Sequence, residues 1–134
     1  MMTATRRSPL VLAPEDGRIY RMPAMRAVFK ADGAETADRY CVSEWWLDPH
    51  STGPGPHSHE ANDEVFYGIG GVMSVRVGDQ WHDVSTGTCV VVPAGTMHDF
   101  ENRSGRLAGL LNVFIPGGFE TSMPAVVRWF EENR

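Results

Sequence analysis

Two histidines separated by a single residue, His57 and His59, are the first candidates for chemistry in this sequence. In an extended chain, side chains two positions apart point to the same side and lie about 6–7 Å apart along the strand, so both imidazoles can face one point. Glu64 follows five residues later, after a polar turn and at the start of the next apolar run. The spacing therefore predicts a chelating site in which Glu64 closes a His-His-carboxylate set.

A third histidine, His98, could supply a fourth ligand to the same site. The turn Pro93-Ala94-Gly95 precedes it and sets the start of a short predicted strand. Three neutral imidazoles and one carboxylate suit iron, manganese, cobalt, nickel, copper or zinc, whereas calcium and magnesium prefer more oxygen ligands. An octahedral ion held by four side chains keeps two open positions for a substrate or O2.

Other polar residues near these positions have simpler explanations. His50 follows Asp48-Pro49 in a predicted turn and His82 lies in a predicted hairpin, and both are expected at the solvent surface. Asp63, beside Glu64, points to the opposite face of its strand and is expected to be solvated or to support a ligand. A lone His-x-His pair also arises by chance, so the pair alone does not establish a metal site.

Two longer patterns carry more weight, because together they contain all four candidate ligands. The first is His57-x-His59-x4-Glu64-x6-Gly71, and the second is Gly87-x5-Pro93-x-Gly95-x2-His98-x3-Asn102. Both resemble the signature motifs of the cupin family, and with the flanking strands the resemblance covers about residues 40–115. One position departs from the family pattern: Ser51 stands where a glycine is expected, and glycines occur instead at positions 53 and 55.

This resemblance implies a small jelly-roll β-barrel that holds a metal ion inside one end. The implied metal ligands are His57, His59, Glu64 and His98, whereas Asn102 is expected to be structural. Within the family, the sequence is similar to single-domain quercetin 2,3-dioxygenase-like proteins over three stretches, at residues 54–67, 76–80 and 116–120. In that group Glu64 would also act as the base that removes a proton from an enol or hydroxyl before O2 attacks the substrate.

Three functions from different classes remain open at this stage. The first is a metal-dependent dioxygenase that acts on an aromatic or enolic small molecule. The second is a metal-dependent isomerase or lyase of a small polar substrate, for which scarce lysine disfavours a phosphorylated compound. The third is a small-molecule-binding cupin without turnover. Phe66 and Phe100 share strand faces with predicted ligands and are expected to line the cavity or to fill the barrel core, whereas Gly68 and Gly70 leave the cavity shape open.

Short strands must position these residues. Glycine and proline recur between short apolar runs from about residue 19 to residue 116, which is typical of an all-β domain. The alternation in Met73, Val75 and Val77, followed by Gly78-Asp79, predicts a hairpin. The predicted strands are 19–30, 40–47, 65–70, 72–77, 81–84, 88–92, 98–102 and 107–115.

The C-terminal residues have a different periodicity. Apolar residues at helical spacing predict a short amphipathic helix, with Thr121 or Ser122 as its N-cap; they are Met123, Val126, Val127 and Phe130. We expect this helix to pack on the outside of the β domain or on a partner subunit. The chain thus divides into an N-terminal arm (1–18), a cupin β-barrel (19–116) and a C-terminal amphipathic helix (117–134).

Composition excludes several classes of partner. The 134 residues carry 12 basic and 17 acidic side chains, and this net charge of −5 argues against nucleic-acid binding. No apolar run is long enough to span a membrane and no hydrophobic leader follows the first residues, so we expect a cytoplasmic protein with a small-molecule substrate.

Cys41 and Cys89 lie in apolar stretches and are expected to be buried free thiols. Exposed strand edges, together with the dimers typical of cupins, predict a homodimer.

Overall fold

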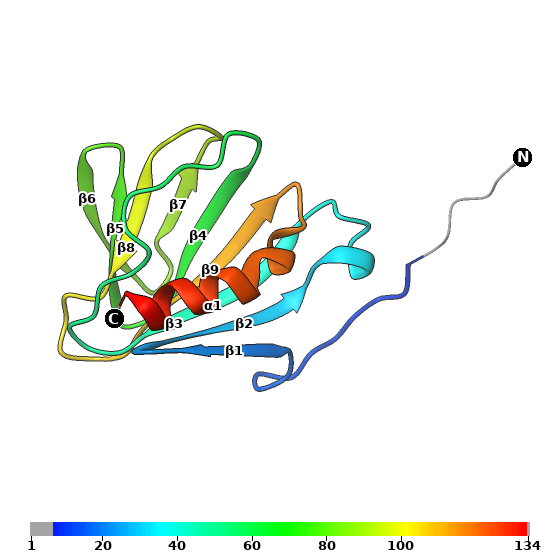
Figure 1. The fold of residues 1–134 in the computed structure, drawn as a ribbon, viewed down its shortest axis with the longest axis horizontal. Helices are drawn as coiled ribbons and strands as arrows, with labels where there is room; N and C mark the ends of the chain where they lie inside the picture. Colours follow the sequence, from blue (N-terminus) through cyan, green and yellow to red (C-terminus); the bar gives the residue numbers. More distant parts are fainter. Residues whose placement is uncertain (1–6, 134) are drawn as a thin grey trace, which may run out of the picture.

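A computed structural model describes residues 7–133 and places nine strands of this range in two antiparallel sheets (Figure 1). The larger sheet has the order β1-β2-β3-β9-β4-β7 and the smaller one β6-β5-β8. The strands are β1 Arg18–Met22, β2 Met25–Ala31, β3 Cys41–Leu47, β4 Asp63–Gly70, β5 Val72–Val77, β6 Gln80–Ser85, β7 Cys89–Val92, β8 His98–Glu101 and β9 Ala108–Ile115. The predicted all-β jelly roll is confirmed.

Alternation along the strands builds the core between the two sheets. In β3 every second residue is buried, so Trp45 points into the core while its neighbour Trp46 lies on the outer face. Gly109, paired with Trp46 across β3 and β9, leaves room for that indole, because a Cβ there would lie 2.4 Å from the ring. The small residue on the partner strand therefore fixes how Trp46 packs on the sheet.

One predicted strand is wrong in its extent. Residues 19–30 form two strands, β1 and β2, which pair as a hairpin around Pro23-Ala24. Ala24 has a φ of +59°, the left-handed conformation that usually falls to glycine in such turns. Pro23 was the available turn signal, but the apolar pattern runs on across the break on both sides of it. The remaining predicted strands are present, and their ends differ from prediction by at most two residues.

The segment between β3 and β4, residues 48–62, is called the lip loop below. Two isolated backbone bridges, Ser51 to Asn102 and His57 to His98, attach it along β8, an edge strand of the smaller sheet. Gly53 lies so close to β8 that a Cβ on it would be 1.9 Å from the carbonyl oxygen of Phe100. Only glycine permits this approach, so the loop can lie against the strand.

Asn102 anchors the base of the lip loop. Its amide nitrogen, in a side chain that is almost fully buried, donates to the carbonyl oxygens of Leu47, Asp48 and Arg106 at 3.0, 3.1 and 2.7 Å. Its amide oxygen accepts from the backbone and side chain of Ser104. The asparagine of the second motif is therefore a structural residue that joins three stretches of backbone.

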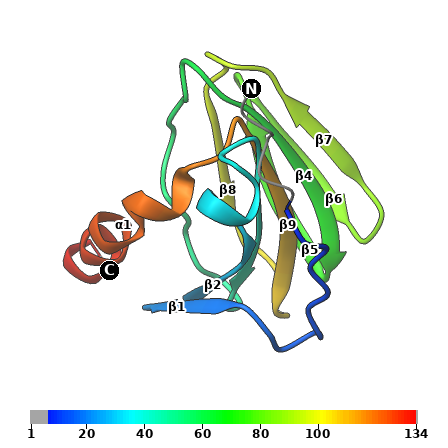
Figure 2. The same ribbon diagram turned by 90° about the vertical axis from the view of Figure 1, so that its right-hand side faces the viewer.

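The C-terminal segment lies over the strands of the larger sheet and beside β1 (Figures 1 and 2). It consists of a 3-10 turn, η2 Phe119–Ser122, and a helix, α1 Met123–Glu132; a second 3-10 turn, η1 Gly33–Glu35, follows β2. Helical periodicity located the helix, and it packs on the edge strand β1 of the β domain. Val126 and Phe130 also line a cavity, which was not expected, because periodicity identifies the apolar face and not the surface that receives it.

Three further expectations concern the arm, the cysteines and membranes. Of the predicted arm, residues 1–6 lie outside the described range, and residues 7–17 contain no helix or strand. Cys41 is buried, but Cys89 is exposed, so the expectation of two buried thiols is wrong for the second; Cys89 lies with Val91 on the solvent-facing side of β7. No helix within residues 7–133 is long and apolar enough to cross a membrane.

Replacing Asn102 tests its anchoring role. Asn102→Ala would remove the donor to the buried carbonyl oxygen of Leu47 and the acceptor of the two Ser104 groups, and we expect the free energy of unfolding to fall by about 2–3 kcal/mol. Chemical denaturation measures this change. Asn62→Ala is the control, because Asn62 makes one exposed hydrogen bond, to the carbonyl of Pro116. Equal losses in the two variants would contradict the anchoring role.

The homodimer remains a prediction, and the outer face of the larger sheet supports it. This face carries exposed apolar residues, including Tyr67, Val91 and Ile115, beside the unpaired edge of β7. Apolar faces and open edges of this kind are commonly covered by a second subunit. We expect light scattering to give about 30 kDa, twice the 14.8 kDa mass of one chain. Val91→Lys, which places a charge on this apolar face, should lower that mass. A mass of about 15 kDa for the parent protein at micromolar concentration would refute the dimer.

Candidate metal centre

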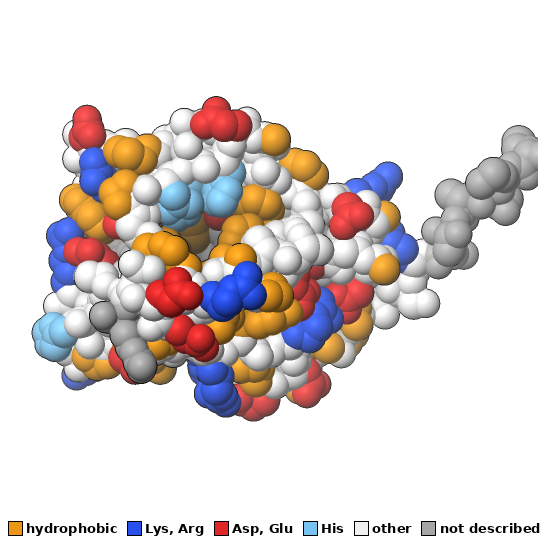
Figure 3. All heavy atoms as spheres, in the orientation of Figure 1, with side chains coloured by type: hydrophobic (Ala, Val, Ile, Leu, Met, Phe, Trp, Pro, Cys, Tyr) orange, Lys and Arg blue, Asp and Glu red, His pale blue; other side chains and the backbone are white. Residues whose placement is uncertain are grey.

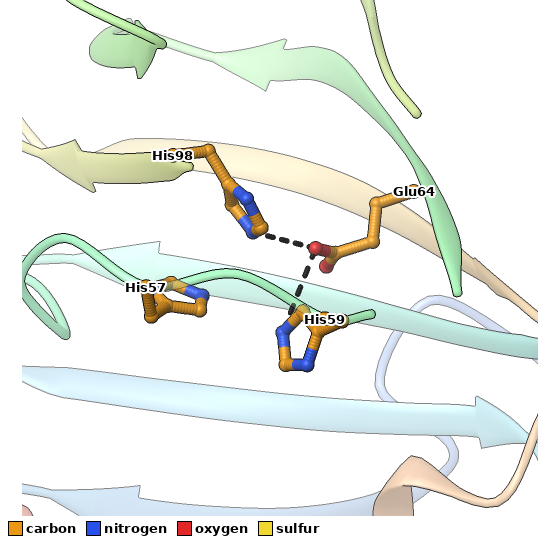
Figure 4. Close-up of side chains that lie close together, drawn as sticks. All are labelled: His57, His59, Glu64 and His98. Carbon is orange, nitrogen blue, oxygen red and sulfur yellow. Dashed lines mark ion pairs between the residues drawn. The ribbon is translucent and has the colours of Figure 1, made fainter. Parts of the chain in front are cut away.

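Four side chains from three separate segments converge at one end of the barrel (Figure 4). His57 and His59 come from the lip loop, Glu64 from the start of β4 and His98 from the start of β8. One potential ligand atom from each residue lies within 4.8 Å of the corresponding atom of every other. The structure thus brings together all four residues that the two motifs single out.

Backbone carbonyls orient two of the imidazoles. Nδ1 of His57 lies 2.8 Å from the carbonyl oxygen of Gly55, and Nδ1 of His98 lies 2.9 Å from that of Thr96. A carbonyl oxygen can only accept, so in each ring Nδ1 must carry the proton. In the neutral imidazole this leaves Nε2 with a free lone pair directed at the cluster, as metal-bound histidines require.

The contact between His98 and Glu64 tests whether a cation fits among these residues. His98 Nε2 and Glu64 Oε2 lie 2.6 Å apart, His59 Nε2 lies 3.7 Å from the same carboxylate oxygen, and neither Glu64 Oε2 nor His98 Nε2 has a hydrogen-bond partner among the described residues. Both side chains are buried, His98 at 1% and Glu64 at 6% exposure. Two buried lone-pair atoms this close repel each other unless a proton or a metal ion lies between them. The donor set therefore suits a divalent transition metal.

Burial and mutual contact shift the pKa values of these groups in different directions. Desolvation lowers the pKa of His57 and of His59, which keeps both rings neutral and able to bind a metal. Burial by itself would raise the pKa of Glu64, but His98, His59 and the Asn112 amide outweigh it and the net pKa is lowered. For His98, desolvation acts downward, yet the Glu64 carboxylate prevails and raises the pKa. Without a metal, Glu64 and His98 thus behave as an ion pair.

A cavity of about 300 Å³ opens next to the cluster. Figure 3 shows histidine side chains at the edge of a hollow bordered by hydrophobic ones. The lining contains five aromatic rings besides the histidines and no lysine or arginine. Its residues are Trp45, Pro54, His57, His59, Glu64, Phe66, Phe100, Asn112, Phe119, Ser122, Val126 and Phe130.

Of the other residues considered from the sequence, some line the cavity and the rest lie at the surface. Phe66 and Phe100 lie in the cavity wall. His50 and His82 are exposed and lie outside the cluster. Asp63 is also exposed, and its carboxylate accepts the backbone N–H of Ala94 at 2.8 Å, so it holds the turn before β8 in place.

Asn112 is a site residue that sequence reasoning missed. Its amide nitrogen donates to Glu64 Oε1 at 3.1 Å, and β9 places it directly opposite Phe66 of β4. One carboxylate oxygen is thereby held, while Oε2 faces the histidines. A polar residue inside the otherwise apolar run 107–115 was the available signal.

A larger hollow of about 940 Å³ lies elsewhere, between the N-terminal arm and the edge of β2 and β3. Its lining includes Arg7, Lys30 and Tyr40 but none of the four clustered residues. Lys30 already donates to three backbone carbonyls of the arm. The smaller cavity is therefore the candidate site, because it alone of the two adjoins the metal ligands.

Comparison with known proteins fits this geometry. Residues 43–114, which include all four clustered residues, match the family described as "Cupin domain". The chain belongs to the cupin family. This membership confirms the resemblance to the family motifs. No curated protein has a matching sequence.

Solved structures share the fold of this cupin. KdgF from Halomonas sp. is 19% identical with a TM-score of 0.70, and the match covers 85% of this chain and 99% of KdgF. Oxalate decarboxylase from Bacillus subtilis, which has Mn(II) centres, is 21% identical with a TM-score of 0.71 over 86% of this chain and 31% of that protein. The polyketide cyclase RemF from Streptomyces resistomycificus is 22% identical with a TM-score of 0.61 over 86% and 80% of the two chains. At such identities the likeness establishes the fold.

Removal of single ligands tests the metal centre. We expect His57→Ala and His98→Ala to lose most of the metal that the parent protein carries, because each removes a neutral donor. Elemental analysis of the purified proteins measures the metal content per chain. His82→Ala, which changes an exposed histidine outside the cluster, should keep the parental content. If both ligand variants retained one metal per chain, the assignment would be wrong.

Proposed function

We propose that this cupin is a metal-dependent dioxygenase that acts on an uncharged aromatic or enolic small molecule. One observation carries the proposal: the cavity beside the four donors is walled by aromatic rings and has no cationic side chain. Apolar walls of this kind favour a flat, neutral compound, whereas the polar contacts are concentrated at the cluster.

The aromatic wall is continuous. The rings of Trp45 and Phe100 lie 6.1 Å apart, those of Phe66 and Phe100 6.0 Å, and those of Trp45 and Phe119 6.2 Å, mostly in edge-on or tilted arrangements. These separations are typical of favourable aromatic pairs. A planar substrate ring would extend this packing and leave a hydroxyl substituent free to face Glu64.

Glu64 is the candidate base for the first proton transfer. Its Oε1 is held by Asn112, and its Oε2 is directed toward the histidines without a hydrogen-bond partner. The lowered pKa of Glu64 keeps the carboxylate ionised and able to accept the proton of an enol hydroxyl. A metal ion held by His57, His59, Glu64 and His98 would supply Lewis acidity and open positions for O2 and substrate.

The electrons and oxygen atoms of a dioxygenase reaction balance without a further reactant. Loss of the hydroxyl proton to Glu64 leaves an electron-rich enolate, which can donate the electrons that reduce O2. Both oxygen atoms can then enter the cleaved product, so no external reductant is needed. The apolar wall excludes water from the cavity and so protects the reacting compound from hydrolysis.

The same wall disfavours the other candidate substrates. Oxalate is a dianion and a sugar phosphate carries at least one negative charge, and beyond a metal ion at the cluster either would find no cationic side chain in the lining to offset its lost hydration. Besides His57, His59 and Glu64, the polar side chains in the wall are those of Asn112 and Ser122. The activity of the oxalate decarboxylase is therefore not carried over to this chain.

Replacement of Glu64 by glutamine separates the base role from metal binding. Glu64→Gln keeps the size and one carbonyl oxygen but removes the proton acceptor, so we expect turnover to fall by about 10²- to 10⁴-fold. O2 uptake measures the rate, with flavonols and other enolic aromatics and with iron(II), manganese or nickel in excess.

The control is Glu60→Gln, which changes an exposed carboxylate on the same loop. It should retain the parental rate, and metal content is measured for every variant. Unchanged turnover in Glu64→Gln would remove the base role. No O2 uptake by the parent protein with any of these metals would overturn the dioxygenase.

A further inference from the structure

Part of the cavity wall comes from residues that follow the family match. The family match ends at residue 114, yet the lining continues with Phe119, Ser122, Val126 and Phe130. None of these side chains can ligate a metal strongly or act as a base near neutral pH. Their contribution to the site is shape and apolar contact.

Hydrogen bonds to Asp32 hold the start of this segment in place. The Asp32 carboxylate accepts the backbone N–H of Gly118 at 2.7 Å and that of Glu120 at 2.8 Å. Glu120 in turn accepts from Arg18 and from the Tyr20 hydroxyl, each at 2.7 Å. The polypeptide that enters α1 is therefore tied to β1 and to the end of β2.

Phe119 lies between this anchor and the metal cluster. Its ring is stacked with Phe29 at 6.3 Å and meets Phe114 edge-on at 5.1 Å. The same ring lies 6.0 Å from the imidazole of His59. The segment is thus packed against the core and reaches the immediate surroundings of a metal ligand.

The helix presents a single stripe to the cavity. Val126 and Phe130, four residues apart, lie on one face of α1, and Ser122, the residue just before the helix, precedes Val126 by the same interval. Val127 is next to Val126, and both are half-buried and packed against the core, but of the two it is Val126 that lines the cavity. Of these two adjacent valines, Val126 is therefore the one placed to contact a ligand in the cavity.

We propose that Val126 and Phe130 are specificity-determining residues, whose side chains set the size of the aromatic compound that the cavity admits. This inference rests on the proposed function, since it concerns the substrate of the same site. A compound with one ring can remain beside the metal ligands, whereas a larger planar compound must extend to α1. The larger compound then contacts Val126 and Phe130, whereas the smaller one does not.

Paired valine variants test the proposal. Catechol serves as the one-ring probe and quercetin as the larger one, and dissociation constants are measured by quenching of tryptophan fluorescence, with Trp45 in the cavity wall as an internal reporter. Val126→Ala should weaken quercetin binding about tenfold, because two methyl groups leave the contact, and should change catechol binding little. Val126→Phe should exclude quercetin and retain catechol.

Val127→Ala is the matched control, with the same change in side chain on the same helix. It should leave the ratio of the two dissociation constants at the parental value, and melting temperature and metal content report on folding in each variant. Equal changes in Val126→Ala and Val127→Ala would overturn the specificity role alone. If the metal-loaded parent bound neither probe, the proposed aromatic substrate class would fail, and this inference with it.

Discussion

The candidate metal centre depends on a backbone connection between the lip loop and β8. His57 and His98 exchange two hydrogen bonds, with N to O distances of 3.0 and 2.8 Å, and so form an isolated bridge. Their side chains leave adjacent points of the backbone, and the two rings lie 4.3 Å apart. Without this bridge the loop would carry its histidines on a flexible segment, and chelation would require ordering of the chain at the moment of binding. The approach of Gly53 to β8 and the Asn102 anchor serve the same connection.

Burial then determines what the assembled donors can do. An apolar surrounding disfavours the protonated form of His57 and His59, which preserves the lone pairs that a metal needs. The same surrounding would neutralise an isolated carboxyl group, but the contacts of Glu64 with His98 and Asn112 keep it charged. The site thus combines neutral donors with one negative charge in a setting where that charge is weakly screened. A divalent cation is stabilised by this combination, and an apolar ligand in the aromatic cavity beside it would be stabilised by removal of its surface from water.

The sequence was informative where local chemistry decides the structure. The four clustered residues were found because motif spacing reports directly on strands and turns, and the hairpin at Gly78-Asp79 followed from turn chemistry. The break at Pro23-Ala24 was missed, although proline signals a turn, because apolar residues continue on both sides of it and alanine at positive φ adds no further signal. Asn112 and the α1 stripe could not be assigned, since each depends on contacts between segments far apart in the chain. Those contacts are decided by how the two sheets and the helix pack.

Residues inside the family match and residues that follow it contribute differently to the site. The barrel supplies the ligands, and other cupins have the same fold, so fold alone does not specify a reaction. The wall beside the ligands has two parts: Trp45 and Phe100 come from the barrel, and residues of α1 line another side. Because α1 buries chiefly Met123 and Phe130 and packs on an edge strand, changes in its exposed positions disturb the core little. A metal centre with fixed ligands and a wall supplied by a peripheral helix allows substrate preference to vary while the chemistry at the metal is retained.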